Sequence, residues 1–280
     1  MNAKFPKRIS IDNWLNLSNK LLQNAGIKSS KLDAELILTF VLNKNRSYIH
    51  AHGDNELSET DHKKANQVLK KRLKRYPLAY IMGKKEFYGR DFIVNKNVLI
   101  PRPESEVIID ILKEKGEEFI NDNLKIIDIG CGSGCLGITA KLELPKSEVL
   151  LIDKSNKALR VAKKNAINLK SKVKFLHDNL LSKQKPNSVN IIIANLPYLD
   201  KEWRRSPETK YEPSIALFAK DNGMSLIKKM IKQSFDIIQQ NGYLILEFEP
   251  IQLSSIKKYA KDLGFNYVKS LNYLSLFKKI

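Results

Sequence analysis

The sequence predicts an α/β protein in which a small N-terminal helical bundle precedes a doubly wound, seven-stranded sheet. Apolar residues in the first third recur at helical spacing, and after residue 103 short apolar runs alternate with amphipathic segments. Glycine-rich or polar segments directly follow several of those runs. In an open sheet of parallel strands, ligands bind at such strand ends, so these segments are the first candidates for a site.

The N-terminal third is expected to contain three long helices. The first follows apolar residues at helical spacing and ends at a glycine. Ser30 followed by Asp33, and Ser58 followed by Asp61, resemble capping boxes that start the other two. A proline ends the third helix, and the predicted bundle covers residues 1–76.

A connector over residues 77–102 is expected to join the bundle to the sheet. Residues 86–94 alternate around a glycine-containing turn, which predicts a β-hairpin. The predicted catalytic domain covers residues 103–280, where strands and helices alternate as in a parallel sheet. Strands are predicted at 125–129, 148–152, 173–176, 190–194, 243–248, 266–270 and 273–278, and helices at 104–120, 134–143, 155–169, 223–240 and 251–263.

The composition restricts the class of protein. The 49 basic and 30 acidic residues give a net charge of +19, which fits either a ribosomal or RNA-bearing environment or the lysine-rich composition of an AT-rich genome; the sequence leaves both open. No apolar run could span a membrane and no secretory signal is recognisable, so we expect a cytoplasmic protein without a membrane partner. Cys131 and Cys135 have no neighbouring ligand residues, which predicts reduced thiols and no metal site.

A glycine-rich loop follows the strand predicted at 125–129. Glycines let the backbone pass close beneath a ligand. The G-x-G-x-G spacing lacks the third glycine of the dinucleotide fingerprint at its usual place, so a nicotinamide or flavin cofactor is disfavoured. The loop resembles the first motif of class I S-adenosylmethionine methyltransferases. We therefore expect the following residues to bind S-adenosylmethionine: Asp128, Gly130, Cys131, Gly132, Ser133 and Gly134.

Polar residues at the ends of the next two strands extend the predicted cofactor site. Asp153 ends the second strand and is placed to accept hydrogen bonds from ribose hydroxyls, the alternative being a helix N-cap region. Asp178 and Asn179 follow the third strand, at the position that faces the adenine in such folds. A simple turn is the alternative for this pair.

Residues 195–198 are the main catalytic candidate, because they follow a buried strand. Pro197 has no N–H and fixes its own φ, so the Leu196 carbonyl is free to join the Asn195 side-chain oxygen as a second acceptor. The two acceptors can hold both hydrogens of a substrate –NH2 group, and Tyr198 can offer a ring face to it. This arrangement predicts methyl transfer from S-adenosylmethionine to a planar nitrogen, with Asn195 also bordering the cofactor.

Taken together, the motifs resemble the bacterial peptide-chain release-factor glutamine methyltransferases over nearly the whole chain. The resemblance implies a class I methyltransferase that acts as a monomer on the glutamine of the Gly-Gly-Gln motif in release factors. It also implies that the helical bundle recognises the release factor, and that Arg102 and Glu104 brace the active-site wall. The chain departs from the family pattern at Leu196, where a proline is usual. The segments that carry the resemblance are 77–81, 86–89, 100–104, the glycine-rich loop, 195–198 and 211–217.

Two other functions are considered. The Asn-Leu-Pro-Tyr motif also resembles that of ribosomal RNA adenine N6-dimethyltransferases, and an adenine amine could use the same acceptors. That family places its helical domain after the catalytic domain, whereas here the helices come first. A non-catalytic RNA- or ribosome-binding protein is the third reading, and the intact cofactor loop, Asp153 and Asn195 argue against it.

Overall fold

The chain divides into two compact units, Met1–Met82 and Gly83–Ile280. Each unit has hydrophobic residues packed into cores of its own. The boundary falls inside the segment predicted as a connector. The computed structural model describes residues 6, 8–119, 123–203 and 205–280.

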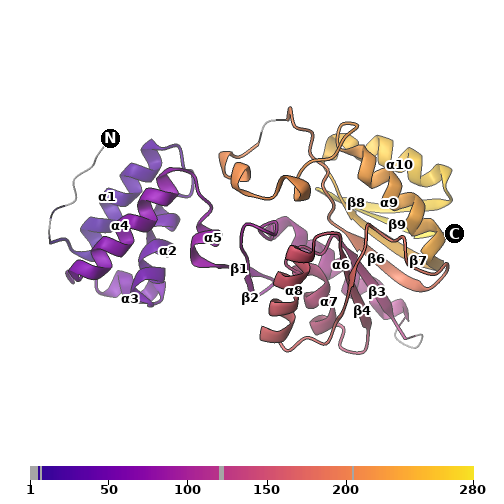
Figure 1. Ribbon diagram of the computed structural model, residues 1–280, viewed down its shortest axis with the longest axis horizontal. Coiled ribbons are helices and arrows are strands. Elements are labelled where there is room, and N and C mark those ends of the chain that lie inside the picture. The colour runs from indigo at the N-terminus through magenta and orange to yellow at the C-terminus, as the bar shows by residue number, and fades with distance from the viewer. Residues whose placement is uncertain (1–5, 7, 120–122, 204) are drawn as a thin grey trace. The chain divides into compact units, whose positions relative to one another are not determined.

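The N-terminal unit is a helical bundle (Figure 1). Its core contains the fully buried side chains of Trp14, Leu22, Ile37, Leu38 and Ile49. The two shortest helices, α3 and α5, are not predicted by the sequence pattern. The helices are α1 Ile11–Asn24, α2 Ser30–Leu42, α3 Arg46–Ala51, α4 Glu59–Leu73 and α5 Leu78–Met82.

The two predicted capping boxes differ in outcome. At the start of α4, the Ser58 hydroxyl accepts a hydrogen bond from the Asp61 N–H at 3.0 Å, as predicted. At α2 the prediction is wrong, because Ser30 is already the first helical residue and the serine before it has no side-chain capping bond. Asp33 instead accepts from Arg72 Nε at 2.6 Å inside the bundle. Its carboxylate therefore joins α2 to α4 through a buried ion pair.

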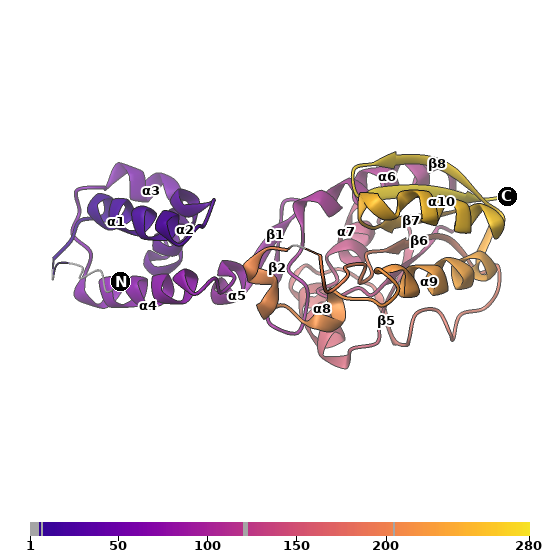
Figure 2. The same ribbon diagram turned by 90° about the horizontal axis from the view of Figure 1, so that it is seen from above.

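The second unit contains the predicted seven-stranded sheet, in the order β5-β4-β3-β6-β7-β9-β8. Strands β3 to β7 pair in parallel, and β9 is antiparallel to both β7 and β8. Although β9 comes last in the chain, it lies between β7 and β8, with α10 beside this end of the sheet (Figure 2). The strands are β3 Lys125–Ile129, β4 Glu148–Asp153, β5 Lys174–His177, β6 Val189–Ala194, β7 Ile238–Glu247, β8 Phe265–Leu271 and β9 Leu274–Lys279, and the separate hairpin is β1 Lys84–Phe87 and β2 Arg90–Ile93.

Successive strand residues alternate between two cores, one on each face of this sheet. Ile126 and Ile191 pack with α6, α7 and α8, whereas Ile127 and Ile192 pack with α9 and α10. The predicted doubly wound α/β architecture is thus confirmed. The α-helices are α6 Val107–Gly116, α7 Cys135–Glu143, α8 Asn156–Asn168, α9 Met224–Ile237 and α10 Leu253–Asp262, and the short 3-10 helices are η1 Pro103–Glu106, η2 Glu117–Phe119, η3 Pro207–Tyr211, η4 Ser214–Ala216 and η5 Pro250–Gln252.

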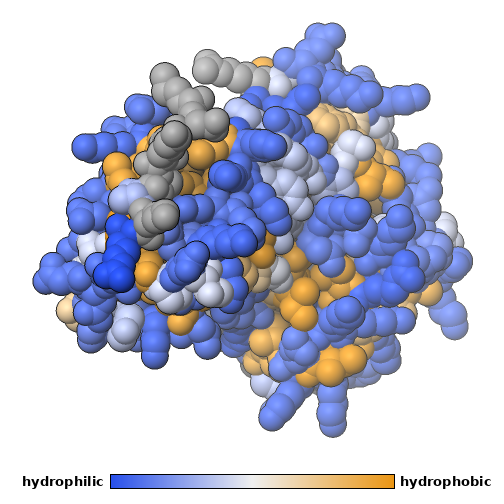
Figure 3. All heavy atoms as spheres, turned by 60° about the vertical axis from the view of Figure 1, so that its left-hand side comes forward, coloured by the Kyte–Doolittle hydropathy of each residue, from blue (hydrophilic) through white to orange (hydrophobic). Residues whose placement is uncertain are grey.

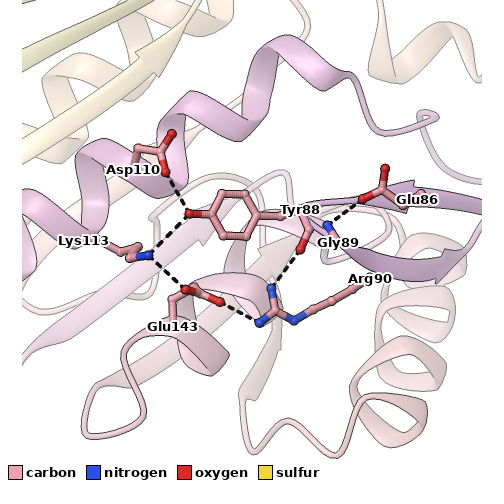
Figure 4. A network of polar contacts seen from close by, with 7 residues as sticks. All are labelled: Glu86, Tyr88, Gly89, Arg90, Asp110, Lys113 and Glu143. Carbon is pink, nitrogen blue, oxygen red and sulfur yellow. Dashed lines mark hydrogen bonds and ion pairs between the residues drawn. The ribbon is translucent and has the colours of Figure 1, made fainter.

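The hairpin β1–β2 is anchored to α6 and α7 by polar contacts around its turn (Figure 4). Tyr88 lies in the turn at φ 51°, and its hydroxyl donates to Asp110 at 2.8 Å. Lys113 Nζ lies 3.1 Å from a Glu143 carboxylate oxygen, and Arg90 Nη2 donates to the other oxygen at 2.6 Å. The turn that the sequence predicts therefore also fastens the hairpin to the domain.

The surface is largely polar. The face drawn in Figure 3 is mostly hydrophilic, with separate hydrophobic areas. Lys63, Lys64 and Lys70 are exposed on α4, so part of the positive charge lies on solvated helical faces. In the part of the chain that the structure describes, no helix is both long and apolar enough to cross a bilayer.

Candidate active site

A cavity opens at the carboxyl ends of β3, β4 and β6. Segments that are far apart in the sequence line it, including residues 97–99, 101–102 and 215–216. Every predicted site residue lines this cavity except Gly134 and Tyr198. Because β4, β3 and β6 are neighbours in the sheet, their carboxyl ends bring the candidates to one edge.

The glycine-rich loop is held open beneath the cavity by its backbone. The N–H groups of Gly130 and Cys131 both donate to the Ile152 carbonyl, at 2.8 and 3.0 Å. Gly130 has φ +69°, and a Cβ there would lie 2.9 Å from Leu196 Cδ2. The positive φ favours glycine at this position, and the Leu196 side chain lies next to the glycine-rich loop.

Two of the predicted cofactor residues support the loop from behind. Gly134 precedes α7 at φ +80°, and a Cβ there would lie 2.8 Å from an Ile138 methyl group. Asp128 accepts a hydrogen bond from the Gly137 N–H at 2.9 Å. Burial raises the pKa of Asp128 to about 7, and the nearby charge of Asp153 adds to the shift. Both residues hold α7 against the sheet.

Asp153 retains acceptor capacity toward the cavity. Its Oδ1 accepts from the Ser155 N–H at 2.7 Å and its Oδ2 from the Gly132 N–H at 3.0 Å. A carboxylate has about four acceptor positions, so each oxygen can accept one more hydrogen bond. Burial raises the pKa of Asp153, while the two backbone donors oppose that shift.

The side chains of Asp178 and Asn179 have different surroundings. The Asp178 carboxylate accepts from the Asn179 N–H, the Ser182 hydroxyl and the Lys183 N–H, at 2.7, 2.6 and 2.9 Å. It therefore organises its own turn, which was the alternative considered from the sequence. The Asn179 side chain is exposed and lines the cavity, which leaves its amide available to a ligand.

The catalytic candidate segment directly follows β6. Asn195 Nδ2 donates to Ser105 Oγ at 3.2 Å. Among the described residues, nothing donates to Asn195 Oδ1 or to the Leu196 carbonyl. Tyr198 lies outside the cavity lining and its hydroxyl donates to Glu247 Oε1 at 3.2 Å. Two acceptors thus stand unpaired at the cavity, while the tyrosine is tied to the next strand.

Comparisons with known proteins agree with this geometry. A model of the PrmC N-terminal domain matches residues 13–83, and a model of the methyltransferase small domain matches residues 103–208. A release factor glutamine methyltransferase of Koribacter versatilis is 35% identical, over 81% of this chain and 82% of its own length. The chain belongs to the release factor glutamine methyltransferase family. The family predicted from the sequence is confirmed.

Members of this glutamine methyltransferase family also occur within longer proteins. A bifunctional methyltransferase of Rickettsia bellii is 34% identical over 91% of this chain and 51% of its own length, so the chain spans about half of that relative. A T. thermophilus 16S rRNA methyltransferase, solved in complex with AdoMet and guanosine, has a TM-score of 0.52 at 14% identity, over 70% of this chain and 49% of its own. This structural likeness confirms the class I methyltransferase fold.

Ser105 and Glu247 join the candidate site, although the sequence pattern does not identify them. Ser105 lies in η1 and lines the cavity, and its hydroxyl donates to Glu247 Oε2 at 2.5 Å. Burial raises the pKa of Glu247. One signal could have found it: Glu247 is a single carboxylate that directly follows the apolar run 243–246, at the same sheet edge as Asn195.

Glu212 joins two of the family motifs. Its Oε1 accepts from Arg102 Nη2 at 2.6 Å, and its Oε2 accepts from the Ile100 N–H at 3.1 Å. The Glu212 side chain is 2% exposed, whereas that of Arg102 is 34% exposed. The loop between β6 and α9 is therefore attached to the segment that leads into η1.

Both cysteines, Cys131 and Cys135, are free thiols. Burial raises the pKa of Cys131 well above its ordinary value and that of Cys135 to about 12. The thiols are therefore protonated near neutral pH and act as compact side chains of the loop and of α7. Over the described residues, no group of three His, Cys, Asp or Glu side chains could hold a metal ion.

Proposed function

We propose that this protein transfers a methyl group from S-adenosylmethionine to the side-chain amide nitrogen of the glutamine in the Gly-Gly-Gln motif of peptide-chain release factors. The observation that carries the proposal is the pair of unpaired acceptors, Asn195 Oδ1 and the Leu196 carbonyl, at the cavity that the glycine-rich loop also lines. Membership of the release factor glutamine methyltransferase family supports the substrate class. The bifunctional relatives are about twice as long as this chain. The proposed activity and partners therefore concern this chain and not the remaining half of those relatives.

The residues around the cavity fit S-adenosylmethionine. We propose that Asp153 accepts hydrogen bonds from the ribose hydroxyls and that the exposed amide of Asn179 faces the adenine. Gly130 and Gly132 have positive φ and no side chains, so the loop backbone can approach the ligand closely. Bound S-adenosylmethionine supplies a methyl group that its sulfonium already activates.

The protein's own contribution is to position and polarise the amide. Asn195 Oδ1 and the Leu196 carbonyl accept the two N–H hydrogens, which aligns the nitrogen with the methyl group. The same acceptors stabilise the positive charge that develops on nitrogen during transfer, and the methylated nitrogen then releases one of its two protons to water. The Leu196 carbonyl lies beyond the end of β6, and Pro197 has no N–H beside it. The absence of a side chain at Gly130 leaves room for Leu196 next to the glycine-rich loop.

The decisive experiment compares three acceptors incubated with labelled S-adenosylmethionine. They are an intact release factor, the same factor with its Gly-Gly-Gln glutamine changed to glutamate, and ribosomal RNA. We expect label in the intact factor alone, because glutamate lacks the –NH2 group. Labelling of the glutamate variant, or of adenine in the RNA, would refute the proposed substrate and favour the RNA methyltransferase alternative.

The N-terminal helical bundle is proposed to recognise the release factor. The match of residues 13–83 to the PrmC N-terminal domain and the separate core of the bundle support this role. We propose that methyl transfer is confined to residues 103–280, with residues 77–102 as the connector. A release-factor substrate would also place the protein in the cytoplasm near ribosomes.

A further inference from the structure

We propose that Glu247 is a positioning residue that acts through Ser105 to orient the amide of Asn195, so that its oxygen and not its nitrogen meets the substrate. This inference rests on the proposed function and deepens it. The same carboxylate also accepts from the hydroxyl of Tyr198 and interacts directly with the Asn195 side chain.

The geometry joins three separate parts of the catalytic unit. Ser105 Oγ donates to Glu247 Oε2 at 2.5 Å, and Asn195 Nδ2 donates to Ser105 Oγ at 3.2 Å. Ser105 and Glu247 are 2% and 3% exposed, so water does not replace these contacts. The three side chains come from η1, from the end of β7 and from the residue after β6.

The direction of the hydrogen bonds follows from what each group can donate. A carboxylate only accepts, so the single proton of the Ser105 hydroxyl goes to Glu247. The Ser105 oxygen can then only accept from Asn195, which requires the NH2 side of the amide. The carbonyl oxygen of Asn195 is thereby left for the substrate.

A neutral amide in place of the Glu247 carboxylate would no longer fix the direction of these hydrogen bonds. The NH2 group of a glutamine at position 247 could donate to Ser105, whose hydroxyl could then donate to Asn195. The Asn195 amide would turn over and present an NH2 group to the NH2 group of the substrate. A buried carboxylate is costly where an apolar residue would pack, so an orienting role explains its presence.

The test measures methyl transfer to the release factor by variants that keep their fold and their affinity for S-adenosylmethionine. We expect Ser105→Ala and Glu247→Gln each to lower kcat on the order of 10–100-fold, with cofactor affinity unchanged. Ser105→Thr keeps the hydroxyl and should restore most of the rate. Ser234→Ala is a matched control, because Ser234 is equally buried in the same unit but bonds to Met230 in α9.

A double-mutant cycle separates orientation from general loosening of the site. If Ser105 acts only through Asn195, Ser105→Ala should cause no further loss in an Asn195→Ala background. An equal loss in both backgrounds, or full activity of Glu247→Gln, would overturn the proposal. Since wild-type protein is assayed in parallel on release factor and RNA, failure of the proposed substrate would show there and not in the cycle. If Ser105→Ala fails to fold, Glu247→Gln in the two backgrounds decides in the same way.

Discussion

Asn195 offers the most direct test of the chemistry at the level of one side chain. Asn195→Ala removes one of two preorganised acceptors, which should lower the methyl-transfer rate on the order of 10²–10³-fold. Affinity for S-adenosylmethionine should change little, because Nδ2 is engaged by Ser105 and not by the loop. Single-turnover kinetics with a release factor would measure the loss. A variant that keeps its full rate would remove Asn195 from catalysis.

Asp153 should matter for the cofactor more than for the chemical step. Asp153→Ala removes the expected ribose acceptor and also the acceptor for the Gly132 N–H. We expect weaker binding of S-adenosylmethionine by roughly 1–3 kcal/mol, the cost of losing hydrogen bonds to a charged acceptor. Calorimetric titration measures this directly. Asp153→Asn is the control, because its remaining side-chain oxygen can still accept some of these hydrogen bonds. Equal affinity of Asp153→Ala and wild type for S-adenosylmethionine would contradict a role of Asp153 in cofactor binding.

The raised pKa of Asp128 predicts that the stability of the folded protein depends on pH and falls as the pH rises. Its folded pKa is about 7 against an ordinary 3.8, so between these values the folded state binds more protons than the unfolded state. Stability should therefore fall as pH rises through this window, and Asp128→Asn should abolish that slope. Relative to wild type, the variant should gain on the order of 3–4 kcal/mol between about pH 4.5 and pH 8. Denaturant unfolding without cofactor checks this; parallel pH curves would contradict it.

At the level of elements, the loop between β6 and α9 is held by an ion pair in which Glu212 is buried and Arg102 is partly exposed. Arg102→Ala would leave the Glu212 carboxylate with only the Ile100 N–H, and should cost about 1–3 kcal/mol of stability. Adding Glu212→Gln should recover part of that loss, because no buried charge then lacks its partner. Denaturant unfolding of the single and double variants tests the pair. Simple additivity of the two substitutions would show that Arg102 and Glu212 are not coupled.

The central strands β3 and β6 could be predicted because each is a short apolar run buried on both faces. The helix predicted at 223–240 runs too far, since α9 ends at Ile237 and Ile238 turns to extended backbone to pair with Val189. Nothing in the glutamine-rich sequence at that point breaks a helical pattern; the pairing partner decides it. The short helices α3 and α5 are missed for a related reason, because they contain too few residues to show a period.

The candidate site could be predicted where a candidate residue lies at the end of a strand or directly after it. Asp153 and Asn195 lie at neighbouring strand ends, and the order of parallel strands brings them together. Ser105 and Glu247 meet Asn195 only because η1 packs over the ends of β6 and β7, which no local pattern encodes. The sequence marks Tyr198 as a motif residue, but its contact with Glu247 depends on the same packing.

For the whole molecule, the two units should be separable. The core of Met1–Met82 shares no residue with the cores of Gly83–Ile280. A chain that lacks residues 1–82 should fold, bind S-adenosylmethionine with near-normal affinity and fail to modify an intact release factor. Calorimetry and the labelling assay measure the two outcomes. Normal modification by the truncated chain would assign the bundle another role.

The interior position of β9 in the sheet affects how the protein folds while it is being synthesised. Ribosomes deliver the chain from its N-terminus, so the helical bundle can fold while the sheet is still being synthesised. Strand β7 then has one unpaired, apolar edge until residues 274–279 are synthesised, because β9 is the strand that pairs with it there. Unpaired edges of this kind invite association with other chains. The edge of β7 therefore stays exposed during synthesis until β9 pairs with it.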